Sequence, residues 1–324
     1  MADTNSRYFS QASRSGMRRS LALAAMLLAL VLAGCQRTPS ADPSAPAAQA
    51  AAQSPSTKAP QDAPAMPDAA QIKPASDAPP SPSSVLYMIY QVDGDGATSY
   101  PIENGSVASY WYGHEFELGG KHYFTGFAYD TPEKYGKSDE ESYPDPDAHV
   151  TLTQATFELA NPGSDKAWAF QGAERYVGEF GGYEKADEVD AKRKAQSYPT
   201  PDGKKLVLAV PTTSFESGVT TSGFATFVFD PGERVKSDDK HWTYVGTVVT
   251  GEDNAAACDD GEVMPCESSS GTLSFEAGKD GGMPVLKVAR SGTTIESAGK
   301  TRALGAADAA TYTYDAAKKQ YATK

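Results

Sequence analysis

The stretch HEFELGGKHYFTGFAY, residues 114–129, decides the fold class of this chain. Its two arms, residues 114–118 and 121–129, carry aromatic residues between polar ones, and only Gly119 and Gly120 separate them. A two-residue glycine connection between runs of this kind is typical of a tight β-hairpin. The stretch therefore predicts two neighbouring antiparallel strands.

Similar short runs recur along the chain, and turn residues separate them. They cover residues 85–92, 148–159, 205–210, 223–230, 241–250, 271–277, 283–290 and 311–315. Several of them alternate between apolar and polar side chains, which indicates strands with one buried face. We therefore expect a mainly β fold, built as an antiparallel β-sandwich or as an open-barrel-like domain.

The folded region is expected to span residues 85–324, which hold thirty of the thirty-two aromatic residues. One segment in it, YEKADEVDAKRKAQ at residues 183–196, predicts a short helix, because it is rich in Glu, Lys and Ala and contains no Gly or Pro. If the region is subdivided, DPGERVKSDDKH at residues 230–241 is the expected boundary. Whether it forms one β domain or two stays open.

The N-terminus has the pattern of an export signal. Two arginines, Arg18 and Arg19, precede the apolar run LALAAMLLALVLAG at residues 21–34. Fourteen helical residues cover about 21 Å, which is shorter than the roughly 30 Å hydrocarbon core of a bilayer. Residues 1–34 are therefore interpreted as a signal peptide, with Met17 as the expected start, and not as a spanning helix.

The end of this signal, Leu32-Ala33-Gly34-Cys35, resembles the lipobox of bacterial lipoproteins. The resemblance implies that diacylglycerol is attached to the Cys35 thiol, that the chain is cut before Cys35, and that the new N-terminus is acylated. Two or more acyl chains anchor a protein stably. In that class a residue other than aspartate after the cysteine, here Gln36, implies passage to the outer membrane of a Gram-negative envelope, facing the periplasm or the cell surface.

A linker follows the expected lipidation site and fills the rest of residues 35–84. From residue 36 onward it contains eleven prolines and fourteen alanines and no aromatic residue. Such a composition cannot bury enough apolar surface to offset the entropy of ordering the chain. We therefore expect a disordered tether between the membrane and the folded region.

The charge balance argues against some partners. The whole chain has 29 basic and 42 acidic side chains, a net charge of −13. Nucleic-acid binding requires a basic surface, and an anionic lipid surface would repel an acidic domain. The predicted contact with the membrane is therefore the N-terminal lipid alone, and no nucleic-acid partner is expected.

Two acidic segments are weak candidates for a cation site. The DGDG segment at residues 93–96 lacks the third acidic ligand of a calcium loop, because Ala97 stands there, and is better read as a turn. The second acidic segment lies in a proline-containing loop and begins with the acidic run at residues 139–141. Its further candidate ligands are Asp145, Asp147 and His149. A solvated acidic loop is the competing interpretation.

No catalytic motif is present in the sequence. His114 and Glu115 begin like a zinc-protease motif, but Leu118 occupies the position of the second histidine. Neither a Gly-x-Ser-x-Gly elbow nor a phosphate-binding glycine loop occurs. The sequence therefore gives no positive support for an enzyme and predicts no cofactor.

The aromatic triplet Tyr110, Trp111 and Tyr112 is a candidate binding platform. In a regular strand, Tyr110 and Tyr112 would share one face and Trp111 would lie on the other. Exposed aromatic rings of this kind bind sugars or protein partners. The alternative is that Trp111 fills the core while the tyrosines cover its edge.

The remaining two cysteines, Cys258 and Cys266, enclose the sequence DDGEVMP. With Cys35 assigned to the lipid, they form an even pair in an oxidising compartment, which favours a disulfide. Seven intervening residues do not match the two-residue gap of a redox motif or zinc knuckle. The sequence thus predicts a local staple.

The combined expectation is a lipid-anchored accessory protein of the cell envelope that binds a protein, a glycan or another envelope component without catalysis. The first alternative is an exported hydrolase that acts on envelope polymers through paired carboxylates. The second is a cation-binding lipoprotein that uses the acidic loop.

Overall fold

The computed structural model describes residues 77–134, 144–232, 240–279 and 282–323. All of these residues belong to one compact unit. The expected signal peptide, the Cys35 lipidation site and the linker as far as residue 76 lie outside the described residues. Within the described ranges, no helix combines the length and the apolar character needed to cross a membrane.

The hairpin predicted from residues 114–129 is present. Strands β2 (Val107–Leu118) and β3 (Lys121–Asp130) pair in antiparallel fashion. Gly119 and Gly120 connect them with φ angles of 61° and 76°. Positive φ at both central residues is the requirement of a type I′ turn, which glycine meets without steric cost.

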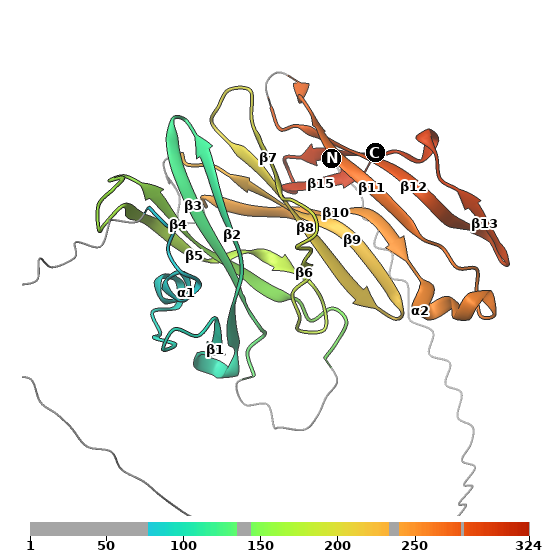
Figure 1. Ribbon diagram of the computed structural model, residues 1–324, viewed down its shortest axis with the longest axis horizontal. Coiled ribbons are helices and arrows are strands. Elements are labelled where there is room, and N and C mark those ends of the chain that lie inside the picture. Colours follow the sequence, from blue (N-terminus) through green and yellow to red (C-terminus); the bar gives the residue numbers. More distant parts are fainter. Residues whose placement is uncertain (1–76, 135–143, 233–239, 280–281, 324) are drawn as a thin grey trace, which may run out of the picture. The chain divides into compact units, whose positions relative to one another are not determined.

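The first sheet extends from this hairpin with the strand order β1-β2-β3-β4-β5, all neighbours being antiparallel. Its other strands are β1 (Ser99–Pro101), β4 (Val150–Leu159) and β5 (Trp168–Phe180). Strand β5 forms one edge of this sheet (Figure 1).

The central sheet has the order β10-β9-β8-β6, and β7 also pairs with β8. Its strands are β6 (Glu188–Val189), β7 (Gln196–Pro199), β8 (Leu206–Glu216), β9 (Val219–Phe229) and β10 (Trp242–Asp253). The third sheet has the order β11-β12-β14-β15, and β13 also pairs with β12. Its strands are β11 (Ser269–Glu276), β12 (Val285–Ser297), β13 (Lys300–Ala303), β14 (Ala310–Asp315) and β15 (Gln320–Thr323).

The central sheet is covered on both faces. Along β8, Leu206 and Leu208 pack against the first sheet, whereas Val207 and Ala209 pack against the third sheet. A strand buried on both faces needs apolar residues at every position. This is why residues 205–210 read as the nearly continuous apolar run KLVLAV. The mainly β, antiparallel, sandwich-like fold class is therefore confirmed.

The core between the first and central sheets is aromatic. Phe127, Phe227 and Trp242 are fully buried, and the Phe127 ring centroid lies 4.8 Å from that of Phe227 and 5.0 Å from that of Trp242. Burial of each such side chain contributes about 1.5–3 kcal/mol or more. The core between the central and third sheets is mainly aliphatic and includes Val245 and Leu286.

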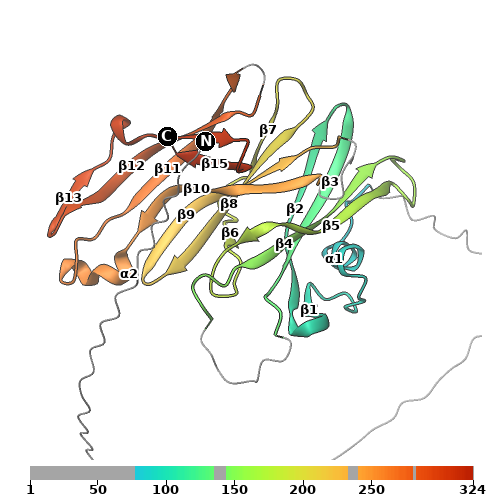
Figure 2. The same cartoon turned by 180° about the vertical axis from the view of Figure 1, so that it is seen from behind.

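The expected strand at residues 85–92 is wrong, because most of this segment is the helix α1 (Pro82–Tyr90). The Ser81 side chain accepts a hydrogen bond from the Ser84 N–H, and Pro82 occupies the first turn, so both residues favour a helix start. The helix buries four residues against the first sheet: Val85, Leu86, Ile89 and Tyr90. Figure 2 shows α1 beside β4 and β5. The folded region therefore begins before Val85.

The helix expected at residues 183–196 is also wrong. Tyr183 and Glu184 have φ angles of 54° and 57°, and the segment holds the two residues of β6 and the first residue of β7. The Arg193 guanidinium donates hydrogen bonds to the carbonyl oxygens of Thr212 and Gly223. These contacts with the central sheet override the helical propensity of the local sequence.

Other short helical turns that lie wholly in the described residues are η1 (Glu103–Gly105), α2 (Ala255–Cys258), η2 (Asp259–Gly261) and η4 (Ala306–Asp308). The segment at residues 230–241, the expected boundary of any subdivision, joins β9 to β10, and these strands pair in the central sheet. Residues 233–239 of that segment lie outside the described residues.

Candidate functional site

The aromatic triplet is divided between two cores by a β-bulge. Tyr110 pairs with Ala128 and Tyr112 pairs with Phe127, so Trp111 is the extra residue of β2. A bulge of this kind disrupts the alternation of side chains. As a result Trp111 and Tyr112 both pack on the aromatic core, while Tyr110 packs on the α1 side.

Trp111 is held inside this arrangement. Its indole Nε1–H donates a hydrogen bond of 2.9 Å to the carbonyl oxygen of Asp187, and its ring centroid lies 5.1 Å from that of Phe180. The partly buried ring is thus held by packing and, at its polar atom, by a hydrogen bond. The triplet does not form a row of exposed rings on one face.

The candidate cation ligands are engaged in local contacts. The Asp145 carboxylate accepts a hydrogen bond from the Asp147 N–H. The His149 Nδ1–H donates to the Gly181 carbonyl oxygen at 2.5 Å, which connects this loop to the end of β5. In the part of the chain that the structure describes, no three His, Cys, Asp or Glu side chains are arranged to hold a metal ion. Residues 139–141 lie outside the described residues.

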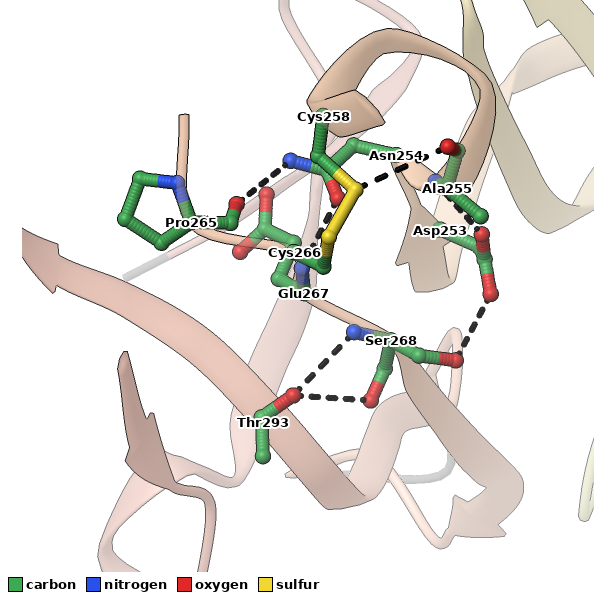
Figure 3. The surroundings of a disulfide bond; sticks show 9 residues. All are labelled: Asp253, Asn254, Ala255, Cys258, Pro265, Cys266, Glu267, Ser268 and Thr293. Carbon is green, nitrogen blue, oxygen red and sulfur yellow. Dashed lines mark hydrogen bonds between the residues drawn. A yellow bond between two sulfur atoms is a disulfide. The ribbon is translucent and has the colours of Figure 1, made fainter. Parts of the chain in front are cut away.

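Cys258 and Cys266 form the predicted disulfide, which closes the loop after α2 (Figure 3). Cys258 is buried, and the Asn254 side chain joins the two ends of the loop. Its amide nitrogen donates to the Pro265 carbonyl oxygen, and its amide oxygen accepts from the Glu267 N–H. The disulfide and Asn254 thus brace the connection between β10 and β11.

Among the described residues, side chains from all three sheets line a cleft of about 800 Å³. It lies beside the edge strands β5 and β10, which contact each other. The turn between β14 and β15 supplies another part of its wall. Its volume falls within the roughly 300–1,000 Å³ of small-ligand sites. We call it the lysine cleft. Its charged and aromatic lining residues are His149, Tyr176, Glu179, Lys205, Asp230, Lys240, Tyr244, Tyr314, Lys318 and Lys319.

The lysines reach the cleft from three separate elements. Lys205 immediately precedes β8, Lys240 precedes β10, and Lys318 and Lys319 lie in the turn before β15. Lys205 forms an ion pair of 3.0 Å with Asp230. Four lysines thus line the cleft, although the chain as a whole is acidic.

Tyrosine rings complete the wall. Tyr176 is 49% exposed, and the Lys240 ammonium lies 4.1 Å from the centroid of its ring, in a cation–π contact. Tyr244 is held more deeply, with its hydroxyl 2.7 Å from the Thr247 hydroxyl, and burial raises its pKa to about 12. Its phenol therefore remains neutral at ordinary pH.

Gly178 determines how closely β10 approaches β5 at this cleft. A Cβ atom at Gly178 would lie 2.7 Å from the Tyr244 Cβ, which is closer than real Cβ contacts. A glycine is thus required here for close packing, and not for a positive φ. It allows Tyr244 to lie between the aromatic core and the cleft wall.

Behind the cleft, a buried carboxylate fixes the start of β10. The Glu174 side chain accepts hydrogen bonds from the His241 N–H at 2.6 Å and from the Trp242 N–H at 3.1 Å. It also accepts from the Gln154 amide at 3.0 Å. Trp242 Nε1–H donates in turn to Thr125 Oγ1 at 3.1 Å. Because Lys240 directly precedes this anchored segment, Glu174 helps to place it at the cleft.

The chain matches no family model, no curated protein and no solved structure. Sequence reasoning did not single out the lysines of the cleft or Tyr176, Tyr244 and Tyr314. The adjacent pair Lys318–Lys319 in a turn was the available local signal, but nothing in the sequence shows that it faces Lys205 and Lys240.

Proposed function

We propose that this chain is a lipid-anchored protein of the Gram-negative cell envelope whose folded part binds an envelope component in the lysine cleft without chemically altering it. The observation that carries the proposal is the cleft itself, which concentrates several lysines and tyrosines in an acidic chain. The lipobox at Leu32–Cys35 and the proline-rich linker support the anchored topology.

The anchoring half of the proposal is tested by labelling cells with a fatty-acid analogue. The native chain should incorporate the label and sediment with membranes. Cys35→Ala should abolish labelling and move the protein to the soluble fraction. Continued membrane association of the unlabelled variant would contradict a lipid anchor.

The binding half is tested by placing a photo-crosslinking residue at Tyr176, in the cleft wall. The matched control is Phe215, which is also aromatic and exposed but does not line the cleft. Cells should yield a discrete adduct at position 176 and little or none at position 215. Equal capture at both positions, or no capture at 176, would contradict a ligand site in the cleft.

A second candidate function, hydrolysis of an envelope polymer, draws on one observation. Two carboxylates, Glu179 and Asp230, line the same tyrosine-containing cleft. A carboxylate pair is what glycoside hydrolysis uses. However, Asp230 is already paired with Lys205, which favours the non-catalytic proposal. Release of reducing ends from envelope polymers, lost in both Glu179→Gln and Asp230→Asn, would favour the hydrolase instead.

A further inference from the structure

A second groove lies beside helix α1, and the described residues that line it are none of those that line the lysine cleft. Its volume is about 570 Å³, which falls within the range of ligand sites. Tyr87, Phe157 and Trp168 contribute aromatic rings to its wall. Tyr87 is 48% exposed, although it belongs to a helix that packs on the first sheet. We call this site the α1 groove.

A proline-containing segment of the chain itself leads into this groove. Residues 77–81, with the sequence DAPPS, directly precede α1, and we call them the strap. Ser81 has φ −64° and ψ 157°, which are close to the values of a polyproline II helix. Pro79 and Pro80 fix their own φ angles near −65°. The strap therefore enters α1 in an extended, polyproline-like conformation.

Trp168 connects the strap to the groove. Its indole Nε1–H donates a hydrogen bond of 3.0 Å to the Asp77 carbonyl oxygen, and the Gly163 N–H donates to the Asp77 carboxylate at 2.6 Å. Trp168 and Pro80 also belong to the groove wall. The groove is thus continuous with a surface that already binds an extended proline-containing segment.

The chemistry of the wall suits a second segment of that kind. A polyproline II helix has no internal hydrogen bonds, so its carbonyl groups accept hydrogen bonds from a partner, and its rings pack on aromatic side chains. Tyr87 supplies both a ring and a hydroxyl group, Ser83 supplies a further hydroxyl group, and Met88 supplies an adaptable apolar surface. Because such a segment is extended before it binds, little conformational entropy is lost on binding.

Asp93 adds a negative charge to the groove wall. It is exposed, and one of its carboxylate oxygens accepts a hydrogen bond from the Asp95 N–H at 3.0 Å. A basic residue beside the prolines of a bound segment would be complementary to this carboxylate. Such a pair would select among proline-rich segments and fix the direction in which one lies.

We infer that the α1 groove binds a proline-rich segment that contains a basic residue and belongs to another protein. The prolines of the segment pack on Tyr87 and Trp168, and its basic residue pairs with Asp93. The inference adds a protein partner to the proposed function and does not depend on what the lysine cleft binds.

The test is calorimetric titration of the full chain carrying Cys35→Ala with three synthetic peptides. Lysine at both ends of octaproline gives the expected ligand chemistry, and glutamate at both ends reverses its charge. Lysine at both ends of a flexible Gly-Ser octapeptide keeps the charge without the polyproline conformation. The lysine–octaproline peptide should bind about fivefold or more tighter than either of the others. Failure of this peptide to bind, or equal binding of either of the other two, would overturn the inference.

Two ring variants locate the binding in the groove. Tyr87→Ala should weaken binding of the lysine–octaproline peptide about fivefold or more, because truncating a central aromatic contact is costly. Alanine is a good helix former, so α1 should persist. Phe215→Ala removes an exposed aromatic ring outside the groove lining and should change the affinity less than about twofold. Equal losses in both variants would contradict binding in the groove.

Two charge variants test the role of Asp93. Asp93→Asn can keep the hydrogen bond to Asp95 but should remove most of the preference for the lysine peptide over the glutamate peptide. Asp95→Asn removes the same charge two residues away, outside the described lining, and should leave most of that preference in place. An equal loss of preference in both variants would show attraction to the acidic chain as a whole and would overturn the pairing with Asp93.

A fourth peptide distinguishes another protein from the tether of this chain. Its sequence, KAPQDAPAMP, is that of residues 58–67. It should bind more weakly than the lysine–octaproline peptide. Equal or tighter binding would make the tether the occupant of the groove and would overturn the inference of a partner protein. The crosslink at position 176 reports on the lysine cleft alone, so either outcome leaves the proposed function to its own test.

Discussion

Two polar regions lie near the start of β10, and they differ in how far their charged groups are exposed to solvent. On the core side, the Glu174 carboxylate is buried and accepts three hydrogen bonds from described residues. On the other side, Tyr176, Lys318 and Lys319 border an open cleft. Both regions depend on β5, and Glu174 and Tyr176 are only two residues apart.

Buried groups such as Glu174 stabilise the fold, whereas exposed groups such as Lys318 and Lys319 can contact a ligand. A buried polar group is tolerated when its hydrogen bonds are made, and removing its partner costs the desolvation of what remains. A charged group at a cleft is solvated and contributes little to folding. Substitutions behind the cleft should therefore change stability, and substitutions in its wall should change binding.

The largest expected effect comes from Glu174→Leu. The substitution removes the acceptor of the Gln154 amide and of the His241 and Trp242 N–H groups. Because three buried donors each lose an acceptor, at about 1–3 kcal/mol per donor, the free energy of unfolding should fall by about 3 kcal/mol or more. Urea denaturation measures this. Glu179→Gln lies on the same strand but in the cleft wall, and should change the free energy of unfolding by less than ~0.5 kcal/mol. Equal losses in the two variants would contradict the distinction between buried groups and groups of the cleft wall.

His114 is a second polar group of the interior, and its Nε2 has no partner among the described residues. Burial lowers its pKa to about 4, below the ordinary value of about 6.5. Between these values the unfolded chain binds the proton more tightly. Stability should thus be lost as pH falls from about 6.5 to 4, by up to ~3 kcal/mol.

This pH dependence is tested by measuring the free energy of unfolding of the native chain and of His114→Phe over the same pH range. The phenyl ring can keep the stacking that His114 makes with Tyr112 and Phe116. The variant should show a pH dependence smaller by about one proton near pH 5. An unchanged slope would mean that His114 is already protonated in the folded protein.

A smaller loss is expected from Gly178→Ala, because the new methyl group would collide with Tyr244. Overpacking of this kind costs about 1–3 kcal/mol. The displaced Tyr244 should also weaken ligand binding, so this variant changes both properties. Gly305→Ala is the control, since nothing lies within 4 Å of the added Cβ and its φ is −147°. Unfolding midpoints that fall equally in both variants would contradict the packing argument.

The smallest effect on stability is expected from Lys318→Ala combined with Lys319→Ala. Exposed charges of this kind contribute less than ~0.5 kcal/mol. The melting temperature should therefore stay close to that of the native chain while ligand affinity falls. A large drop in stability would instead place the two lysines among the groups that stabilise the fold.

Much of the fold could be predicted from local sequence. The two-glycine connection at 119–120 specifies its hairpin through backbone geometry alone, and the run at 205–210 indicates a strand by composition. Local sequence also led to two wrong predictions, the strand at residues 85–92 and the helix at residues 183–196. Ser81 and Pro82 carry a helix-start pattern, but they stand at the end of a proline-rich segment that was assigned to the linker. The helical composition of residues 183–196 is overridden by contacts of Arg193 with the central sheet.

The cleft could not be predicted in the same way. Its lysines occupy positions 205, 240, 318 and 319, and only the pairing of three sheets brings them together. The aromatic triplet is easily seen in the sequence. The bulge at Trp111, which directs its side chains toward two different cores, could not be predicted from it. The disulfide could be predicted, because parity and short separation are properties of the sequence alone.

Lysine acylation footprinting of the full chain by mass spectrometry, in intact cells and after purification away from the envelope, tests most directly whether the lysine cleft binds an envelope component. In cells, an occupant of the cleft should slow modification of Lys318 and Lys319 and leave Lys166 and Lys194 unchanged. Protection confined to lysines outside the cleft, or equal reactivity of Lys318 and Lys319 in cells and after purification, would contradict a ligand-binding site in the lysine cleft.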